Sequence, residues 1–236
     1  MEALKDVQLL AFDVFGTVVD WRGSVAREVE RLGLGISGAE FADAWRRRYL
    51  PSMKQVREGK REWVNLDALH RENLDAVLEK FGAAGRLDDA AKAHLNRAWH
   101  RLDAWADSVA GLTSLKSKYV VTTLSNGNLG LLTHLSKRAG LPWDCILSAE
   151  VFKAYKPDPR TYLGVAQLFA LQPQQVMLCA AHAEDLRAAA AQGLRTAYID
   201  RPQEWGPDVR GDVPNESDRF DVLATDIPDL ARQLSC

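Results

Sequence analysis

The stretch Phe12–Thr17, with the sequence FDVFGT, places an acidic residue, Asp13, directly after an apolar run. A buried carboxylate is costly unless a cation or hydrogen-bond donors compensate its charge, and such carboxylates are common at functional sites. A helix N-cap is the ordinary alternative for Asp13, but no apolar helical stripe begins within a few residues of it. Asp13 is therefore the first candidate for a reacting group.

Polar side chains also follow three later apolar runs that read as buried strands. They are Ser125 and Asn126 after residues 119–124, Lys156 after residues 145–151, and His182 and Asp185 after residues 176–181. Singly, they have ordinary explanations as a turn, an exposed lysine, a buried histidine and a first-turn helix acid. Ligands of open α/β sheets bind beyond the carboxyl ends of the strands. Four such ends together predict one site.

The hydrophobic pattern predicts the elements that position these groups. From residue 20 to residue 107, apolar residues recur at helical spacings, as in Phe41, Trp45 and Tyr49, with no strand signal. After residue 108, apolar runs alternate with helical stripes, which is typical of a parallel sheet covered on both faces. We expect an α/β fold with a doubly wound parallel sheet in a core domain of residues 1–18 and 108–236. An all-helical cap domain of residues 19–107 would be inserted after the first strand.

The expected core elements can be given as ranges. The strands are residues 7–14, 119–124, 145–151, 176–181 and 196–200, and the helices are residues 129–140, 159–171, 185–194 and 227–234. Gly140 is the expected end of the first of these helices.

Composition restricts the partners and the compartment. The formal net charge of −2 gives no reason to expect a nucleic-acid partner or an acidic membrane surface. Cys145 and Cys179 lie in apolar runs and no CxxC pair occurs, so reduced thiols and a cytoplasmic location are expected. The N-terminal MEALKD lacks the basic segment of a secretory signal, and no run approaches the roughly 20 apolar residues of a membrane span.

In chain order, the DVFGT motif, SN after the second core strand, the lysine of AYKPD and the acid after the fourth strand resemble the haloacid dehalogenase superfamily. With AWRRRYL and TLSNGN, the chain is most similar to the 2-haloacid dehalogenases (type II), and this resemblance extends over nearly its whole length. The resemblance implies a Rossmann-like core with a helical cap, hydrolysis of carbon–halogen bonds without a metal or other cofactor, and a homodimer.

The resemblance also implies a mechanism. Asp13 attacks C2 of a 2-haloacid and displaces halide, and water then hydrolyses the aspartyl ester to a 2-hydroxyacid, with inversion where C2 is chiral. Halide leaves without a general acid, so Phe15 is acceptable where related phosphatases have a second acid. Carried over position by position, the resemblance implies that Lys156 keeps Asp13 ionised, and that Asp185 pairs with Lys156 and helps to orient water. Thr17 and Tyr162 would hydrogen-bond around the nucleophile, Arg46 would bind the anionic end of the substrate or the departing halide, and Asn126 would solvate the halide. Ser125 and the backbone of Val14 and Phe15 would hold the substrate carboxylate, and Leu66 takes the place of an aromatic residue that lines the halide pocket.

One segment departs from the family pattern. Ala180 and His182 stand where the family has Ser and Asn, which help to place the hydrolytic water. The ordinary pKa of imidazole is near neutral. We therefore hypothesise that His182 accepts a proton from water during ester hydrolysis.

Three alternatives stay open on the sequence alone. A related hydrolase could apply the same covalent chemistry to another electrophilic carbon, such as a strained ring amine or a phosphonate-type substrate. A phosphatase is disfavoured, because Phe15 has no proton to give and Lys156 beside His182 suits a metal-free anion site better than Mg²⁺. An idle scaffold is disfavoured too, because the buried charges of Asp13, Lys156 and Asp185 would be a liability without a function.

Overall fold

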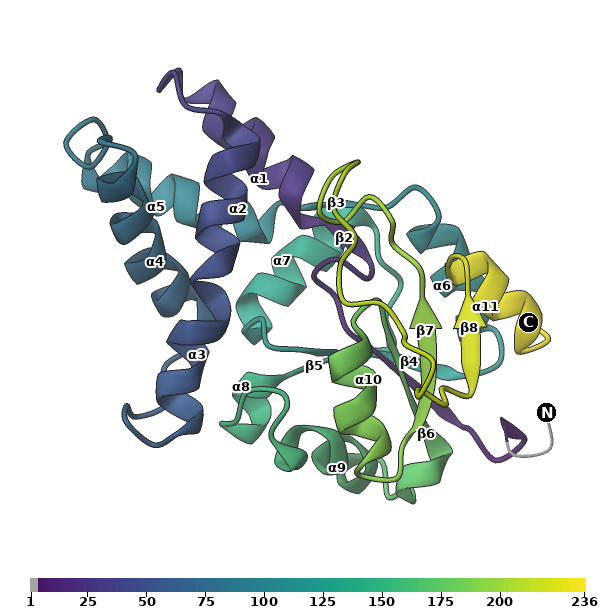
Figure 1. Ribbon diagram of the computed structural model, residues 1–236. Coiled ribbons are helices and arrows are strands. Elements are labelled where there is room, and N and C mark those ends of the chain that lie inside the picture. Colours follow the sequence, from purple (N-terminus) through teal and green to yellow (C-terminus); the bar gives the residue numbers. More distant parts are fainter. Residues whose placement is uncertain (1–3) are drawn as a thin grey trace.

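The computed structural model describes residues 4–236 and contains a six-stranded parallel sheet in the order β5-β4-β1-β6-β7-β8 (Figure 1). Its strands are β1 Leu9–Phe12, β4 Val120–Ser125, β5 Cys145–Ser148, β6 Val176–Ala180, β7 Arg195–Ile199 and β8 Val222–Ala224. The predicted parallel α/β sheet is confirmed. Residues 1–3, which belong to the predicted core domain and to the N-terminal segment considered above, lie outside the described residues.

Strand β1 is central, and the order of the sheet reverses beside it. The chain runs outward through β4 and β5 on one side and through β6, β7 and β8 on the other. Phe12, the last residue of β1, pairs with Thr123 of β4 and Cys179 of β6. Because ligands bind where the strand order of such a sheet reverses, the residues directly after Phe12 occupy the expected position of a site.

Both faces of β1 are buried, which explains its unbroken apolar run. Leu10 and Phe12 belong to one hydrophobic cluster, and Leu9 and Ala11 belong to another. The first cluster includes residues of α6 Ser108–Lys116, α7 Leu129–Ala139 and α11 Ile227–Gln233, and the second includes residues of α9 Pro159–Leu168 and α10 Ala183–Ala190. Successive strand side chains point to opposite faces, so helices cover both faces of the sheet.

A group of helices lies to one side of the sheet in Figure 1 and is called the helical layer below. It comprises α1 Trp21–Arg31, α2 Gly38–Arg47, α3 Tyr49–Arg57, α4 Leu66–Lys80, α5 Asp89–Asn96 and the 3₁₀ turn η2 Arg97–His100. The side chains of Ser37, Asn65 and Asp88 accept backbone N–H groups at the starts of α2, α4 and α5, as N-caps do. The domain limits at residues 18/19 and 107/108 stay predictions.

Two local predictions are wrong. Val19–Asp20 (β2) and Asp103–Ala104 (β3) form an antiparallel ladder within the segment predicted to be all-helical. Two residues are too few to show the alternation that identifies a strand. The strand predicted for residues 145–151 ends at Ser148, whose side chain accepts the Glu150 N–H and starts the short helix α8 Ala149–Phe152.

The ends of the other core helices differ little from the expectation. Helix α7 ends at Gly140 in the left-handed conformation, as predicted. Helix α9 ends at Leu168 rather than residue 171, and a 3₁₀ turn, η3 Pro173–Gln175, leads into β6. Within residues 4–236 no helix has the length and apolar character needed to cross a membrane.

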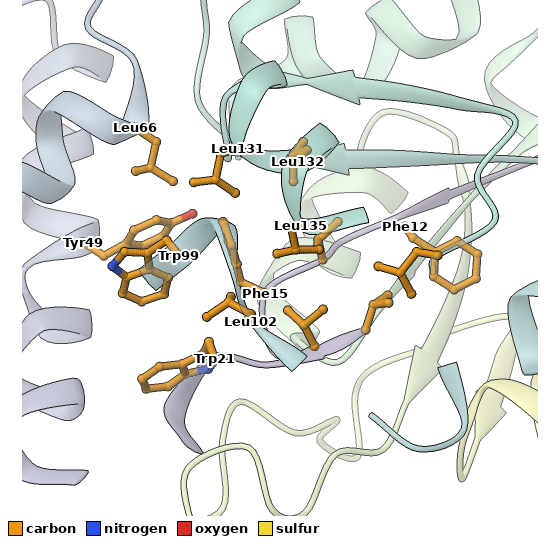
Figure 2. Close-up of a cluster of buried hydrophobic side chains, with 14 of the residues drawn as sticks. Phe12, Phe15, Trp21, Tyr49, Leu66, Trp99, Leu102, Leu131, Leu132 and Leu135 are labelled. Atoms are coloured by element: carbon orange, nitrogen blue, oxygen red, sulfur yellow. The ribbon is translucent and has the colours of Figure 1, made fainter. Parts of the chain in front are cut away.

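Aromatic side chains join the helical layer to the carboxyl end of β1. The Trp99 ring lies 5.7 Å from the Phe15 ring, edge to face, and stacks on Trp21 at 6.2 Å. Figure 2 shows Phe15, Trp21, Tyr49 and Trp99 in this buried cluster. The apolar contact area of these large rings holds the helical layer over the end of the strand.

Candidate active site

Asp13 directly follows β1, and both of its carboxylate oxygens have partners. Oδ1 accepts a hydrogen bond from Lys156 Nζ at 3.0 Å. Oδ2 accepts one from Thr17 Oγ1 at 2.9 Å and lies 3.2 Å from His182 Nδ1. The Thr17 hydroxyl itself accepts the Ala181 N–H at 2.9 Å, which leaves the hydroxyl proton for Asp13. The predicted neighbourhood of Asp13 is thus assembled from the ends of β1 and β6 and a distant loop.

Lys156 joins two carboxylates. Its ammonium group also donates to Oδ2 of Asp185, and Oδ1 of Asp185 accepts a hydrogen bond from the Tyr162 hydroxyl at 2.6 Å. The Lys156 backbone N–H donates to Oδ1 of Asn126 at 2.8 Å, which ties the lysine loop to the end of β4. Lys156 therefore lies, with its charge compensated, between Asp13 and Asp185.

The charges of this cluster favour an ionised nucleophile. Burial alone would raise the pKa of Asp13, but the Lys156 charge and the His182 hydrogen bond hold it well below its ordinary value. Burial would lower the pKa of Lys156, but Asp13 and Asp185 raise it above its ordinary value. Asp13 is consequently a carboxylate and Lys156 an ammonium ion across the neutral range.

His182 lies between Asp13 and a second buried acid, Glu204. Its Nε2 is 3.0 Å from Oε1 and 3.1 Å from Oε2 of Glu204, whose side chain is 3% exposed. Burial lowers the pKa of His182, but the Glu204 charge and the Asp13 hydrogen bond outweigh this and raise it to about 10. An imidazolium ion cannot accept a proton, so the raised pKa of His182 argues against the base role hypothesised for it, which stays a prediction.

The sequence reasoning missed Glu204, Arg201 and Tyr49. Glu204 and Arg201 follow β7, whose carboxyl end was not counted among the strand ends expected to form the site. Arg201 donates to the Thr17 carbonyl oxygen at 2.8 Å and pairs with Asp107 at 2.8 Å, so it supports the loop after Asp13. Tyr49 gave no signal beyond a helical apolar spacing.

A cavity of about 560 Å³ opens in front of Asp13. The predicted residues on its wall are Asp13, Phe15, Arg46, Asn126, Lys156, Tyr162, His182 and Asp185. Thr17 lies behind Asp13, bonded to its Oδ2. Asp13, Lys156 and Asp185 therefore face the same space as Arg46, a cation from the helical layer.

The structure does not bring three predicted binding residues to this wall. Leu66, the first residue of α4, is buried in the hydrophobic cluster of the helical layer (Figure 2), so the pocket role predicted for it is not supported. Ser125 is fully buried, and its hydroxyl accepts the Gly127 N–H at 3.2 Å instead of facing the cavity. The Val14 side chain packs in the core, and the predicted backbone role of Val14 stays a prediction.

Arg46 lies on the cavity wall, held by two aromatic rings. Its guanidinium carbon lies 4.1 Å from the ring centre of Tyr49 and 5.5 Å from that of Trp21, which fixes the planar group by cation–π contact. Within residues 4–236, the buried Nη1 has no hydrogen-bond partner. A buried donor normally has an acceptor, so Arg46 has hydrogen-bonding capacity that is not used within the described residues.

The outer part of the cavity is formed by the helical layer and the connection between β7 and β8. Leu50, Trp205 and Val209 give it an apolar character, and Arg47 and Arg210 add positive charge. In the part of the chain that the structure describes, no group of three or more His, Cys, Asp and Glu side chains is arranged to hold a metal ion.

Comparison with known proteins identifies the family. Residues 7–193 match the family model of the haloacid dehalogenase-like hydrolases. (S)-2-haloacid dehalogenase 1 of Pseudomonas sp. (strain CBS-3) is 31% identical over 86% of this chain and 89% of its own length, and (S)-2-haloacid dehalogenase 4A of Burkholderia cepacia is 30% identical over 97% and 100%. The solved structure of the defluorinating L-2-haloacid dehalogenase Rha0230 is 48% identical, covers 98% of this chain and 96% of its own, and superposes with a TM-score of 0.93. With Asp13, Lys156 and Arg46 on one cavity, the chain belongs to the haloacid dehalogenase-like hydrolases, in the family of the 2-haloacid dehalogenases.

Proposed function

We propose that the protein is a hydrolytic dehalogenase that converts short 2-haloalkanoic acids to 2-hydroxyacids and halide through an ester on Asp13. The observation that carries this proposal is the ionised Asp13 on the wall of a cavity, with the Lys156 ammonium group hydrogen-bonded to it and Arg46 on the same wall. The names of the relatives specify (S)-2-haloacids, and one solved relative is described as defluorinating. (S)-2-chloro and (S)-2-fluoro acids are therefore the proposed substrates.

In the first step, a carboxylate oxygen of Asp13 attacks C2 and the carbon–halogen bond breaks. Arg46 binds the anionic end of the substrate or the departing halide, and its planar pair of donors suits a carboxylate. Asn126 contacts the halide, and Phe15 provides an apolar wall that excludes water from the nucleophile. Back-side displacement inverts C2. Because the halide takes the bonding electron pair with it, the step needs no proton.

In the second step, water attacks the carbonyl carbon of the ester. Asp185 and Asp13 share the Lys156 ammonium group, and the Tyr162 hydroxyl fixes the orientation of the Asp185 carboxylate. Asp185 orients the water and takes up its proton. The products are the 2-hydroxyacid and one proton, and Asp13 returns to its carboxylate form.

The proposal extends to properties that follow from family resemblance. The enzyme would act in the cytoplasm, without a metal or other cofactor, as a homodimer whose residues 19–107 form the cap. Light scattering of the purified protein tests the dimer. Dialysis against a chelator, with activity measured before and after, tests the absence of a metal requirement.

Halide release is the direct test of the activity. An ion-selective electrode would follow chloroacetate, fluoroacetate and the two enantiomers of 2-chloropropionate, with Asp13→Asn as the inactive reference. We expect halide from the acetates and from the (S) enantiomer, and loss of about 10⁴-fold or more with Asp13→Asn. Release of phosphate from para-nitrophenyl phosphate in the presence of Mg²⁺, without release of halide, would instead support the phosphatase alternative.

A further inference from the structure

The two oxygens of the Asp13 carboxylate are not equivalent. Among residues 4–236, Oδ1 has one hydrogen-bond donor, Lys156 Nζ, whereas Oδ2 has two, Thr17 Oγ1 and His182 Nδ1. A carboxylate oxygen offers two lone pairs in its plane. Oδ1 thus has a lone pair free for attack on carbon, and Oδ2 is the oxygen that becomes the carbonyl of the ester.

We propose that His182, positioned by Glu204, donates a hydrogen bond to this carbonyl oxygen and stabilises the negative charge that develops there during ester hydrolysis. His182 and Thr17 would form a two-donor oxyanion hole, in which the imidazolium is the charged member. This inference rests on the proposed function, because it requires the ester. In this role His182 is a hydrogen-bond donor and not a base, because it keeps its proton throughout ester hydrolysis.

The atoms balance without a proton from His182. The water oxygen bonds to the carbonyl carbon, the π electron pair moves onto Oδ2, and the water proton passes to Asp185. The bond between the carbonyl carbon and Oδ1 then breaks, and Oδ1 leaves as the oxygen of the 2-hydroxyacid, which takes the proton held by Asp185. The regenerated carboxyl group of Asp13 releases the second water proton. The water oxygen therefore ends in Asp13 and Oδ1 ends in the product.

Glu204 is held in a fixed place for this role. Oε1 accepts the Trp21 indole N–H at 3.0 Å, and the acid is almost fully buried. Gly16, with a φ of +89°, lies against it so closely that a Cβ there would be 2.2 Å from Oε1. The Glu204 carboxylate, and with it the His182 ring, cannot shift without disturbing the turn that carries Asp13.

The charged groups around His182 come from several elements. They are Asp13 after β1, Arg46 of α2, Lys156 of the loop before α9, Glu184 and Asp185 of α10, and Glu204, Arg210 and Asp212 of the connection after β7. Two of them, Asp13 and Glu204, contact the ring. When Asp13 becomes an ester its charge disappears, whereas Glu204 remains, so Glu204 is the group that keeps the ring protonated for the second step.

This role predicts a direction for the pH dependence. A protonated donor makes ester hydrolysis slower at high pH, because the donor is lost as His182 deprotonates. A base would make it faster as pH rises. In Glu204→Gln, the amide can still bond to the ring but carries no charge, so His182 should lose its proton at lower pH. The fall in the rate of ester hydrolysis at high pH, the descending limb of its pH profile, should therefore move to lower pH.

The experiment is a single-turnover measurement on the full-length protein with (S)-2-chloropropionate. Rapid quenching and intact-mass analysis give the rates of ester formation and ester hydrolysis separately, from about pH 6 to pH 10, the span between the ordinary and the raised His182 pKa. The proteins are wild type, His182→Ala, His182→Asn and Glu204→Gln. Glu79→Gln, an exposed change of the same chemistry on α4, is the matched control.

We expect ester hydrolysis to slow by about 100- to 1,000-fold in His182→Ala, the usual effect of removing one oxyanion-hole donor. His182→Asn should recover part of the rate, because its amide can still donate, and Glu204→Gln should shift the descending limb to lower pH. In each variant the loss in the rate of ester formation should be smaller than the loss in the rate of ester hydrolysis, and the control should match wild type in both rates. An ascending limb that His182→Ala abolishes, or an unshifted limb in Glu204→Gln, would overturn the inference while leaving the ester mechanism intact. If no ester forms in any protein, the proposed function is wrong and the inference falls with it.

Discussion

The Lys156 ammonium group lies 3.0 Å from Oδ1 of Asp13, although 143 positions separate the two residues. The same ammonium group donates to Asp185, so one buried cation serves two buried carboxylates. Removal of one partner from a buried ion pair leaves an uncompensated charge, whose cost exceeds the net stabilisation of the intact pair. The contact therefore has consequences for both stability and activity.

Lys156→Met should abolish activity and lower the free energy of unfolding by about 3–5 kcal/mol, because it leaves Asp13 and Asp185 buried without their cation. Urea unfolding at neutral pH measures the change. Lys137→Met, on the exposed face of α7, is the control and should change the free energy by less than about 0.5 kcal/mol. Equal stability of the two variants would mean that Lys156 does not compensate these charges.

Arg46→Lys should lower kcat/KM by about 10- to 100-fold, in line with the loss of a hydrogen bond between charged groups. A lysine keeps the charge but loses the planar group that stacks on Tyr49 at the cavity wall. Steady-state kinetics with (S)-2-chloropropionate measure the change, and Arg48→Lys, an exposed arginine two residues away, is the control. If the two variants behaved alike, the anion site would have to lie elsewhere.

Gly16→Ala should destabilise the protein more than Gly33→Ala. Both glycines have a positive φ, so both substitutions carry a backbone cost of about 1–2 kcal/mol. Only at Gly16 would the new methyl group also collide with Glu204, whereas Gly33 has no atoms within 4 Å of the added Cβ position. Thermal unfolding compares the two variants. Equal losses of stability would contradict the packing of Glu204 against the turn.

The stability of the wild type should fall more steeply with alkaline pH than that of His182→Asn. Burial opposes the charge of His182, but Glu204 and Asp13 raise its pKa from 6.5 to about 10 in the folded protein. The resulting stabilisation is complete below about pH 6.5 and is lost as pH rises through 10. Urea unfolding of both proteins between pH 7 and pH 10 measures it. Parallel curves would show that the ring is not charged in the folded protein.

Much of the fold and the position of Asp13 at the cavity could be predicted from the sequence because their signals are local. The apolar run before Asp13 identified a strand buried on both faces, and the polar residues after the strands identified the site. Strands β2 and β3 were not predicted, because a strand of two residues is too short to show an alternation of apolar and polar side chains.

The role of Glu204 and the position of Leu66 depend on tertiary packing. Glu204 approaches His182 only because the connection after β7 folds back over the end of β1, and no spacing in the sequence encodes that approach. Leu66 begins α4, and whether its side chain faced the cavity or the core depended on how α4 packs, which family resemblance alone did not determine. Contacts between distant segments are the part that required the structure.

In the proposed mechanism Asp13 itself becomes covalently bonded to the substrate carbon. Mass analysis of peptides from protein quenched in acid during turnover of (S)-2-chloropropionate would detect this bond. We expect the peptide containing Asp13 to gain the mass of a carboxyethyl group, in step with chloride release, and we expect Asp13→Asn to show neither. Steady chloride release with an unmodified Asp13 peptide at every quench time, in the wild type and in His182→Ala alike, would contradict the proposed mechanism.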